Sequence, residues 1–140
     1  MKPSTQNYLK AIVMLEISQE SPLIKMRDIS KRLQVSQPAV ADMIKKLEAS
    51  DYVQNLPYRG VNLTEKGRHL GMQMIRHHRL WEAFLQQELN IPFDRVHAEA
   101  ELLEHAGSDY LIGLIEQKLG FPTQDPHGNP IPDQELRFPG

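Results

Sequence analysis

The chain has 140 residues, a length that suits one ordinary domain or two small ones sharing a core. With 40% hydrophobic and 24% charged residues, it has the composition of a globular protein and not of a disordered one. It has no apolar stretch as long as a membrane span and no signal-type N-terminus, so we expect a cytoplasmic protein with no membrane partner. The absence of cysteine excludes disulfides and thiolate metal sites.

The net charge of −2 is distributed unevenly along the chain. Residues 1–62 carry nine Lys and Arg against six Asp and Glu, a net charge of +3. Residues 63–140 carry seven against twelve, a net charge of −5. This pattern fits a mildly basic module joined to an acidic one.

The first third of the chain predicts three helices. Ser36 is a natural N-cap for the third of them, and Pro38 is tolerated within its first turn. The second and third helices are separated by a turn, which is the helix-turn-helix pattern. Apolar residues at helical spacing give the ranges 4–18, 26–33 and 37–49.

The segments DYVQNL and VNL predict a β-hairpin. Pro57 and Gly60 in the intervening PYRG favour the turn. A hairpin that directly follows a helix-turn-helix forms a wing. We therefore expect a winged helix-turn-helix over residues 1–63.

The remainder of the chain predicts more helices and then a tail. Gly120 is placed to cap the last helix, and residues 121–140 hold five of the ten prolines. We expect a mainly α fold, with a helical domain over 64–120 and an extended, partly loose Pro-rich tail over 121–140. The predicted helices cover about 64–88, 93–106 and 109–119.

Six side chains suited to metal binding recur at helical spacing in two segments, HHRLWEAF and VHAEAELLEH. On a helix, the four in the second segment fall within an arc of about 100°, and the two in the first are four residues apart. Imidazole and carboxylate ligands suit divalent first-row cations. The candidate ligands are His78, Glu82, His97, Glu101, Glu104 and His105.

Other interpretations of these residues remain open. The same spacing is typical of two amphipathic helices whose charges face water. Clustered carboxylates and histidines also build dinuclear hydrolases and oxidases, but the chain has no nucleophile elbow and no phosphate loop, so we do not expect an enzyme. Of the other histidines, we expect His77 to face solvent. His69 does not share the helix face of the candidate ligands, and His127 lies in the tail.

The third helix offers a polar face for DNA. Short polar residues at its start can enter a major groove, and its lysines can meet phosphates. Asp42 either reads a cytosine amino group or keeps the surface soluble, and a winged helix can instead bind protein. The candidate DNA-binding residues are Arg27, Ser36, Gln37, Pro38, Ala39, Asp42, Lys45, Lys46 and Arg59.

The ordered segments SQPAVADMIKKLEASDYV, YRGVNLTEKG, HHRLWEAFL, VHAEAELLEH and HGNPIP closely resemble the diphtheria toxin repressor and manganese transport regulator family. The resemblance covers essentially the whole chain. It implies a homodimeric, metal-activated repressor that binds a palindromic operator on double-stranded DNA and takes no small organic ligand. The chain resembles the short form without an SH3-like domain, so we expect the ancillary metal site to use water or to be partly filled.

The resemblance also implies which residues bind metal. The ancillary site would use His78, Glu82 and His97. Asn7 and Glu101 stand in the primary site where the iron-responsive branch has methionine and cysteine, and the manganese branch has aspartate and glutamate. The primary site would thus consist of Asn7, Glu101, Glu104 and His105.

Glu101 favours Mn²⁺ as the cofactor, with Fe²⁺ as the alternative. The ancillary site is more similar to that of the iron branch. The sequence therefore predicts a manganese-responsive repressor. The alternatives are an iron-responsive repressor of the same family and a metal-independent winged-helix regulator or protein-interaction module.

Overall fold

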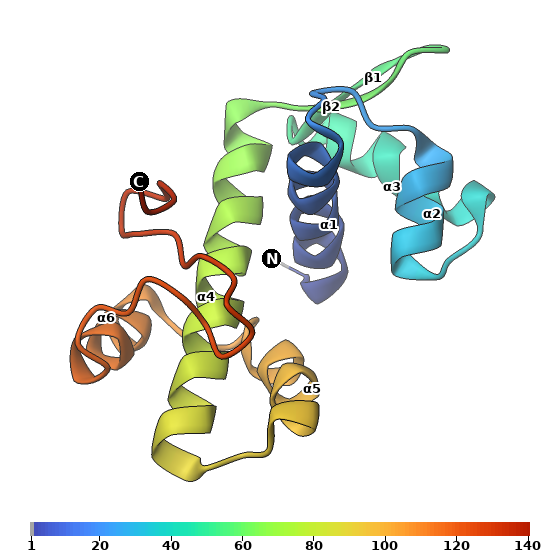
Figure 1. Ribbon diagram of the computed structural model, residues 1–140. Coiled ribbons are helices and arrows are strands. Elements are labelled where there is room, and N and C mark those ends of the chain that lie inside the picture. Colours follow the sequence, from blue (N-terminus) through green and yellow to red (C-terminus); the bar gives the residue numbers. More distant parts are fainter. Residues whose placement is uncertain (1) are drawn as a thin grey trace. The chain divides into compact units, whose positions relative to one another are not determined.

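A computed structural model describes residues 2–140 and confirms the expected mainly α fold (Figure 1). The described chain forms two compact units, Met1–Met72 and Gln73–Gly140, whose boundary falls within the long helix α4. None of its helices is both long and apolar enough to cross a membrane. The elements are α1 (Pro3–Gln19), α2 (Met26–Leu33), α3 (Gln37–Ala49), β1 (Val53–Leu56), β2 (Gly60–Leu63), α4 (Glu65–Leu89), α5 (Phe93–Leu103) and α6 (Asp109–Lys118).

The first unit is a winged helix-turn-helix, as predicted. The apolar stripe of α3 is fully turned inward, since Val40, Ile44 and Leu47 are all buried. The Ser36 hydroxyl accepts a hydrogen bond from the backbone N–H of Ala39 at 3.2 Å, which confirms the predicted N-cap. Burial of one face of α3 leaves its opposite face in solvent.

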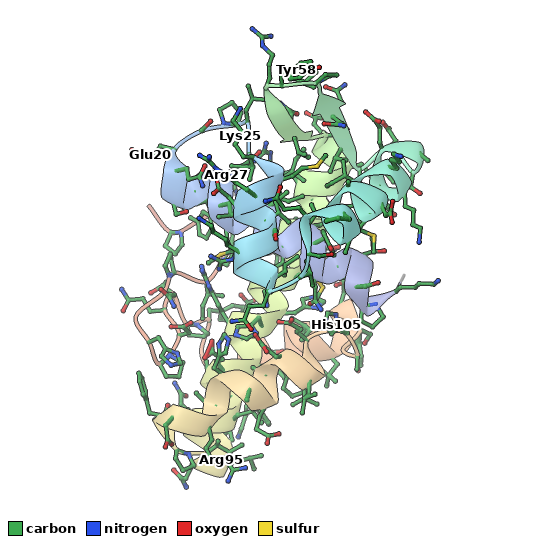
Figure 2. The ribbon with its side chains drawn as sticks, turned by 90° about the vertical axis from the view of Figure 1, so that its right-hand side faces the viewer. Glu20, Lys25, Arg27, Tyr58, Arg95 and His105 are labelled. Carbon is green, nitrogen blue, oxygen red and sulfur yellow. The ribbon has the colours of Figure 1, made fainter. Side chains whose placement is uncertain are left out.

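The wing is a two-stranded antiparallel hairpin. Val53 pairs with Leu63, and both side chains are buried. Ile24 forms an isolated antiparallel bridge with Val61, which attaches the segment before α2 to the hairpin. Tyr58 lies at the exposed tip, where its carbonyl accepts a hydrogen bond from Lys25 Nζ (Figure 2).

The start of α4 packs closely on α1 within the first unit. A Cβ atom on Gly71 would lie 2.7 Å from the Leu9 carbonyl oxygen and 2.6 Å from Val13 Cγ2. Real Cβ atoms do not approach backbone this closely, so a side chain at this position would force the two helices apart.

The second unit has two small apolar cores along α4. One contains Leu80, Ile112 and the tail residue Ile131. The other consists of Leu85, Val96 and Ala100. The partly buried Trp81 and Phe84 pack against both.

The C-terminal tail has no helix, as expected, but it is packed rather than loose. Ile131 is buried against α4 and α6, and this burial removes apolar surface from water. The Arg76 guanidinium donates to both carboxylate oxygens of Glu116 at 2.8 Å and to the Pro132 carbonyl at 2.9 Å. Arg79 also donates to a tail carbonyl, that of Pro130.

Replacement of Glu116 by glutamine should destabilise the protein by about 3 kcal/mol at neutral pH, because it leaves the buried Arg76 charge without its partner. Hydrogen bonds from Arg76 hold the pKa of Glu116 below its usual value against the opposing effect of burial. A lowered folded-state pKa means that this stabilisation is complete above the ordinary carboxyl pKa and is lost as the pH falls through the lowered value.

Urea unfolding at neutral pH measures the loss of stability in Glu116→Gln, and urea unfolding at acid pH measures how that loss depends on pH. The difference in stability between wild type and Glu116→Gln should narrow on acidification. Glu88→Gln, an exposed position on α4, is the matched control and should change stability little. Equal effects of the two substitutions would contradict the role of the buried pair.

Candidate metal centre

The six predicted ligands of the helical domain all lie in the second unit. His78 and Glu82 are one turn apart on α4, and His97 and Glu101 are one turn apart on α5. We predicted that the second of these helices extends to residue 106, but α5 ends at Leu103. The next helix, α6, begins after its N-cap residue Ser108, so the chain turns between α5 and α6. Glu104 and His105 lie in this turn.

His78 lies at the centre of the cluster and is buried. Its Nδ1 atom is 2.6 Å from Glu104 Oε2, while its Nε2 atom is 3.0 Å from Glu82 Oε1 and 3.1 Å from His97 Nδ1. Glu104 was predicted for the primary site, and Glu82 and His97 for the ancillary site. The His78 ring therefore connects residues of both predicted sites.

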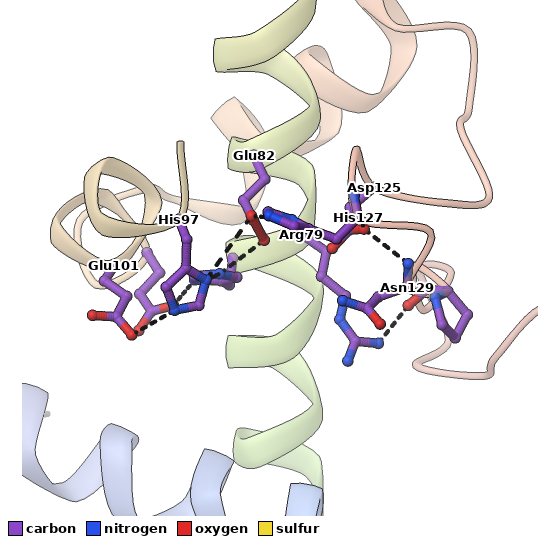
Figure 3. A network of polar contacts seen from close by, with 10 residues as sticks. Arg79, Glu82, His97, Glu101, Asp125, His127 and Asn129 are labelled. Atoms are coloured by element: carbon purple, nitrogen blue, oxygen red, sulfur yellow. Dashed lines mark hydrogen bonds and ion pairs between the residues drawn. The ribbon is translucent and has the colours of Figure 1, made fainter. Parts of the chain in front are cut away.

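One side of the cluster is buried and the other faces solvent. The side chains of Glu82 and Glu104 are 2% and 1% exposed, whereas those of His97 and Glu101 are 59% and 54% exposed. His97 Nε2 and Glu101 Oε1 lie 3.0 Å apart at this open side (Figure 3). His105 Nε2 is 3.6 Å from Glu104 Oε1. An ion can reach the cluster from the α5 side.

Glu82 is surrounded by imidazoles. Burial acts to raise its pKa, but the hydrogen bond with His78 and the charges of His78, His127 and His97 outweigh that effect and lower the pKa below its usual value. Its carboxylate form is therefore favoured, and a carboxylate is the form that binds a cation.

The residues fit a divalent metal ion. One donor atom from each of His78, Glu82 and His97 lies within 4.8 Å of the others. Glu82 Oε2 is buried and lies 2.9 Å from His127 Nδ1 and 3.9 Å from His97 Nδ1, so it faces imidazole nitrogens that can share a cation with it. Imidazole nitrogen and carboxylate oxygen suit first-row metals such as Mn(II), Fe(II) and Zn(II).

Two tail residues of this region, Asp125 and His127, were not predicted as ligands. His127 Nδ1 lies 2.9 Å from Glu82 Oε2, and Figure 3 shows the His127 ring pointing towards Glu82 from the side opposite to His97. Glu82, Asp125 and His127 form a second group with donor atoms within 4.8 Å of one another. Tail residues have no helical register with α4, so only the segment HGNPIP marked this region as notable.

The expectation that His77 faces solvent is wrong. His77 is buried, and its Nε2 atom lies 3.4 Å from Asp109 Oδ1. Burial lowers its pKa, and Asp109 opposes that shift. Packing of α6 beside α4 covers this face, which the period of α4 alone does not reveal.

The predicted ligand Asn7 and all predicted DNA-binding residues belong to the first unit. Asn7 is half-buried on α1, and its role as a ligand stays a prediction. All of the predicted DNA-binding residues are exposed to solvent: Arg27, Ser36, Gln37, Pro38, Ala39, Asp42, Lys45, Lys46 and Arg59.

The first unit is a winged helix-turn-helix, a fold that binds DNA. The second unit is helical and contains a cluster of imidazoles and carboxylates, which are metal ligands. Together they define a class of DNA-binding proteins with a candidate metal site. Residues 1–61 match the family model described as iron dependent repressor, N-terminal DNA binding domain. Residues 64–133 match the model described as iron dependent repressor, metal binding and dimerisation domain. The chain belongs to this family, which consists of DNA-binding repressors and not of enzymes, as expected.

Individual relatives carry the names of iron and of manganese regulators. The chain is 36% identical to the iron-dependent repressor IdeR of Mycobacterium bovis and 34% identical to the diphtheria toxin repressor of Corynebacterium efficiens. Each match covers 92% of this chain and 55% of the relative. The chain thus spans little more than half the length of these relatives.

The solved structures to which this chain is similar include manganese regulators. A manganese-dependent transcriptional repressor in complex with manganese superimposes with a TM-score of 0.85 and 40% identity, over 97% of this chain and 62% of the other. The manganese regulator SloR gives a TM-score of 0.84 and 37% identity, over 99% and 64%. These names leave the choice between manganese and iron open.

Replacement of His78 by alanine should weaken metal binding more than loss of a single peripheral ligand, because this ring contacts residues of both predicted sites. Equilibrium dialysis with Mn(II) should show at least a tenfold loss of affinity, the lower end for disruption of a metal site's ligand framework. His69→Ala, an exposed position on α4, should bind like wild type. Retention of full affinity by His78→Ala would contradict this assignment.

Proposed function

We propose that this chain is a divalent-metal-activated transcriptional repressor that responds to manganese and controls metal-ion homeostasis. The observation that carries the proposal is the cluster around His78, which brings predicted primary and ancillary ligands together in the unit that matches a metal-binding domain. The proposed partner is double-stranded DNA, which places the proposed action in the cytoplasm.

The proposed ligands fall into two groups. His78, Glu82 and His97 form the ancillary group, whose donors already lie together. The primary group is proposed to consist of Asn7, Glu101, Glu104 and His105. When bound, a divalent cation supplies positive charge that offsets repulsion among the carboxylates.

The proposed DNA-binding surface is the exposed face of α3 together with the wing. Ser36, Gln37 and Pro38 are proposed to lie at base edges, since they form the exposed start of α3. Lys45, Lys46 and Arg59 are proposed to meet phosphates. Phosphate contacts fix the orientation of the protein, and base contacts give the sequence preference.

A homodimer is proposed because apolar side chains of the second unit remain in solvent. Leu102, Tyr110, Leu111 and Leu114 are all exposed on or near α5 and α6. A second copy of the same surface would remove this apolar area from water. A twofold dimer then reads a palindrome whose half-sites are about one helical turn apart or more.

Metal binding favours the DNA-binding state only by the difference in its affinity for the two states of the protein. The ion must therefore bind more tightly when the chain adopts the conformation that fits the operator. By reciprocity, the operator raises metal affinity by the same factor.

Manganese is proposed over iron because of Glu101. Its carboxylate, together with Glu104 and His105, gives a hard site without sulfur, which suits Mn(II). Mn(II) is the weakest binder of the first-row series, so its selection must depend on coordination geometry and not on raw affinity. The iron-responsive alternative is favoured by the names of the mycobacterial and corynebacterial relatives.

DNA binding should require metal. Chelator should reduce affinity for the chain's own promoter region by at least tenfold, because the empty carboxylate cluster no longer favours the DNA-binding conformation. Electrophoretic mobility shifts with and without Mn(II) measure this effect. Sedimentation should show a dimer in both conditions.

A scrambled DNA of equal length is the control and should bind weakly in both conditions. Undiminished promoter affinity in chelator would favour the metal-independent regulator. Absence of DNA binding in all conditions, with a protein partner instead, would favour the interaction module.

Glu101→Cys should reduce activation by Mn(II) and increase the response to softer, thiolate-preferring metals. Wild type should respond to Mn(II), with Zn(II) binding tightly but activating poorly. Promoter binding titrated against free Mn(II), Fe(II) and Zn(II) gives the three activation midpoints, and we expect the Mn(II) midpoint to rise by at least tenfold in the variant.

Glu99→Cys, two positions away on α5, is the matched control and should leave the order of metals unchanged. The manganese assignment is wrong if wild type responds to Fe(II) at far lower free concentration than Mn(II) and Glu101→Cys leaves that ratio unchanged.

A further inference from the structure

We propose that Tyr58, at the tip of the wing, contacts DNA. Its ring would pack on the sugar–phosphate backbone that flanks the base pairs read by α3, and its hydroxyl would donate a hydrogen bond to a phosphate oxygen. The inference rests on the proposed function only in taking double-stranded DNA as the partner. It does not depend on which metal activates the chain, or on whether a metal does.

The ring of Tyr58 is wholly in water. Of the exposed large hydrophobic side chains among residues 2–140, that of Tyr58 has the highest exposed fraction, 102%. The hydrophobic stabilisation of a fold is proportional to the apolar area that leaves water, and this ring contributes none. Stability of the fold therefore gives no reason for an aromatic residue at the wing tip.

The backbone at Tyr58 is in a conformation that disfavours a large side chain. Its φ is 65°, in the left-handed region. The Arg59 N–H donates to the Leu56 carbonyl at 2.9 Å, which closes a turn with Pro57 second and Tyr58 third. A positive φ at the third residue is typical of a type II turn, where Gly or Asn is the usual residue. Tyrosine here costs conformational energy that glycine would not, and such strain gathers at functional sites.

Phe121 provides an internal comparison. It is the other aromatic residue of the described chain with a left-handed backbone, with φ of 57°. Its side chain is 61% exposed, so part of its surface is covered by the rest of the chain. Packing thus gives Phe121 a structural contribution that Tyr58 lacks.

The wing tip is held in place before any DNA binds. Ile24 and Val61 exchange backbone hydrogen bonds of 2.9 and 2.7 Å, and Lys25 Nζ donates to the Tyr58 carbonyl at 3.2 Å (Figure 2). A Cβ atom on Gly60 would lie 2.9 Å from the Ile24 carbonyl oxygen, so the close approach of hairpin and segment requires glycine. A fixed turn lowers the conformational entropy that the ring loses on binding.

The hairpin is also tied to the helix proposed to read bases. The Asn55 N–H on β1 donates to Glu48 Oε2 near the end of α3 at 2.8 Å. When a recognition helix lies in the major groove, elements beside it meet the adjacent backbone or minor groove. The exposed cations Lys25 and Arg59 next to Tyr58 favour phosphate as its neighbour. Tyrosine hydroxyls are among the groups that donate to phosphate oxygens.

Substitutions that suit the turn separate binding from folding. Gly and Asn both adopt a left-handed backbone readily, so Tyr58→Gly and Tyr58→Asn should unfold at the same urea concentration as wild type or a higher one. Their affinity for DNA should nevertheless fall about tenfold, because a hydrogen bond to a charged group and the ring contact are lost. Tyr58→Phe keeps the ring and should lose less affinity than either.

Mobility shifts measure these affinities for the full chain on two DNAs. One is the chain's own promoter region with Mn(II), and the other is a scrambled duplex at low salt. A backbone contact carries no sequence information, so the loss should be similar on both. The dependence of affinity on salt should stay at its wild-type slope, because a neutral hydroxyl neutralises no phosphate. Lys46→Ala, in contrast, should reduce that slope by about one unit.

Phe121→Asn is the matched control. It makes the same kind of change, aromatic to Asn at a left-handed residue, in the second unit, and it should keep wild-type affinity for both DNAs. Hydroxyl-radical footprinting supplies an independent measurement. Tyr58→Gly should lose protection of the deoxyriboses that flank the operator and retain the protection given by α3.

Wild-type affinity and an unchanged footprint in Tyr58→Gly and Tyr58→Asn would overturn the proposal, and would leave a protein partner as the occupant of the wing tip. An equal loss of affinity in Phe121→Asn would also overturn it, because the effect would then not belong to the wing. If wild type binds DNA equally with and without metal, the proposed metal activation fails while the Tyr58 comparison still decides. Absence of binding to either DNA would overturn both proposals.

Discussion

The structure of the second unit depends on how the negative charge of one buried carboxylate, that of Glu82, is compensated. Glu82 is 2% exposed, and a charge removed from water to this degree is costly unless it is paired. Three imidazoles from three segments surround it: His78 from α4, His97 from α5 and His127 from the tail. The three segments thus meet around one buried negative charge, which their imidazoles stabilise.

The surrounding packing keeps this polar region in position. The hydrogen bond from Arg76 to the Pro132 carbonyl and the burial of Ile131 hold the tail on α4, while Val96 holds α5 through its apolar contacts. The contrast between buried Glu104 and exposed Glu101 follows from this framework. The cluster therefore has a buried side at Glu104 and a solvent-exposed side at Glu101.

The division into two units separates the proposed tasks. The first unit leaves the face of α3 that contains Ser36 and Lys46 in solvent, because Val40, Ile44 and Leu47 occupy its core face. The second unit holds the ligand cluster and the exposed apolar residues around α6. Family models for DNA binding and for metal binding with dimerisation match these same parts of the chain.

The sequence by itself determined the helices, the wing and most of the cluster, because these features are local. The spacing of His78 and Glu82 places both on one face of any helix, and the stripe of Val40, Ile44 and Leu47 fixes the buried face of α3. Tertiary structure alone decided the burial of His77 and the approach of His127 to Glu82. Those contacts join segments without a shared register, and the energy of burial, not local periodicity, selects them.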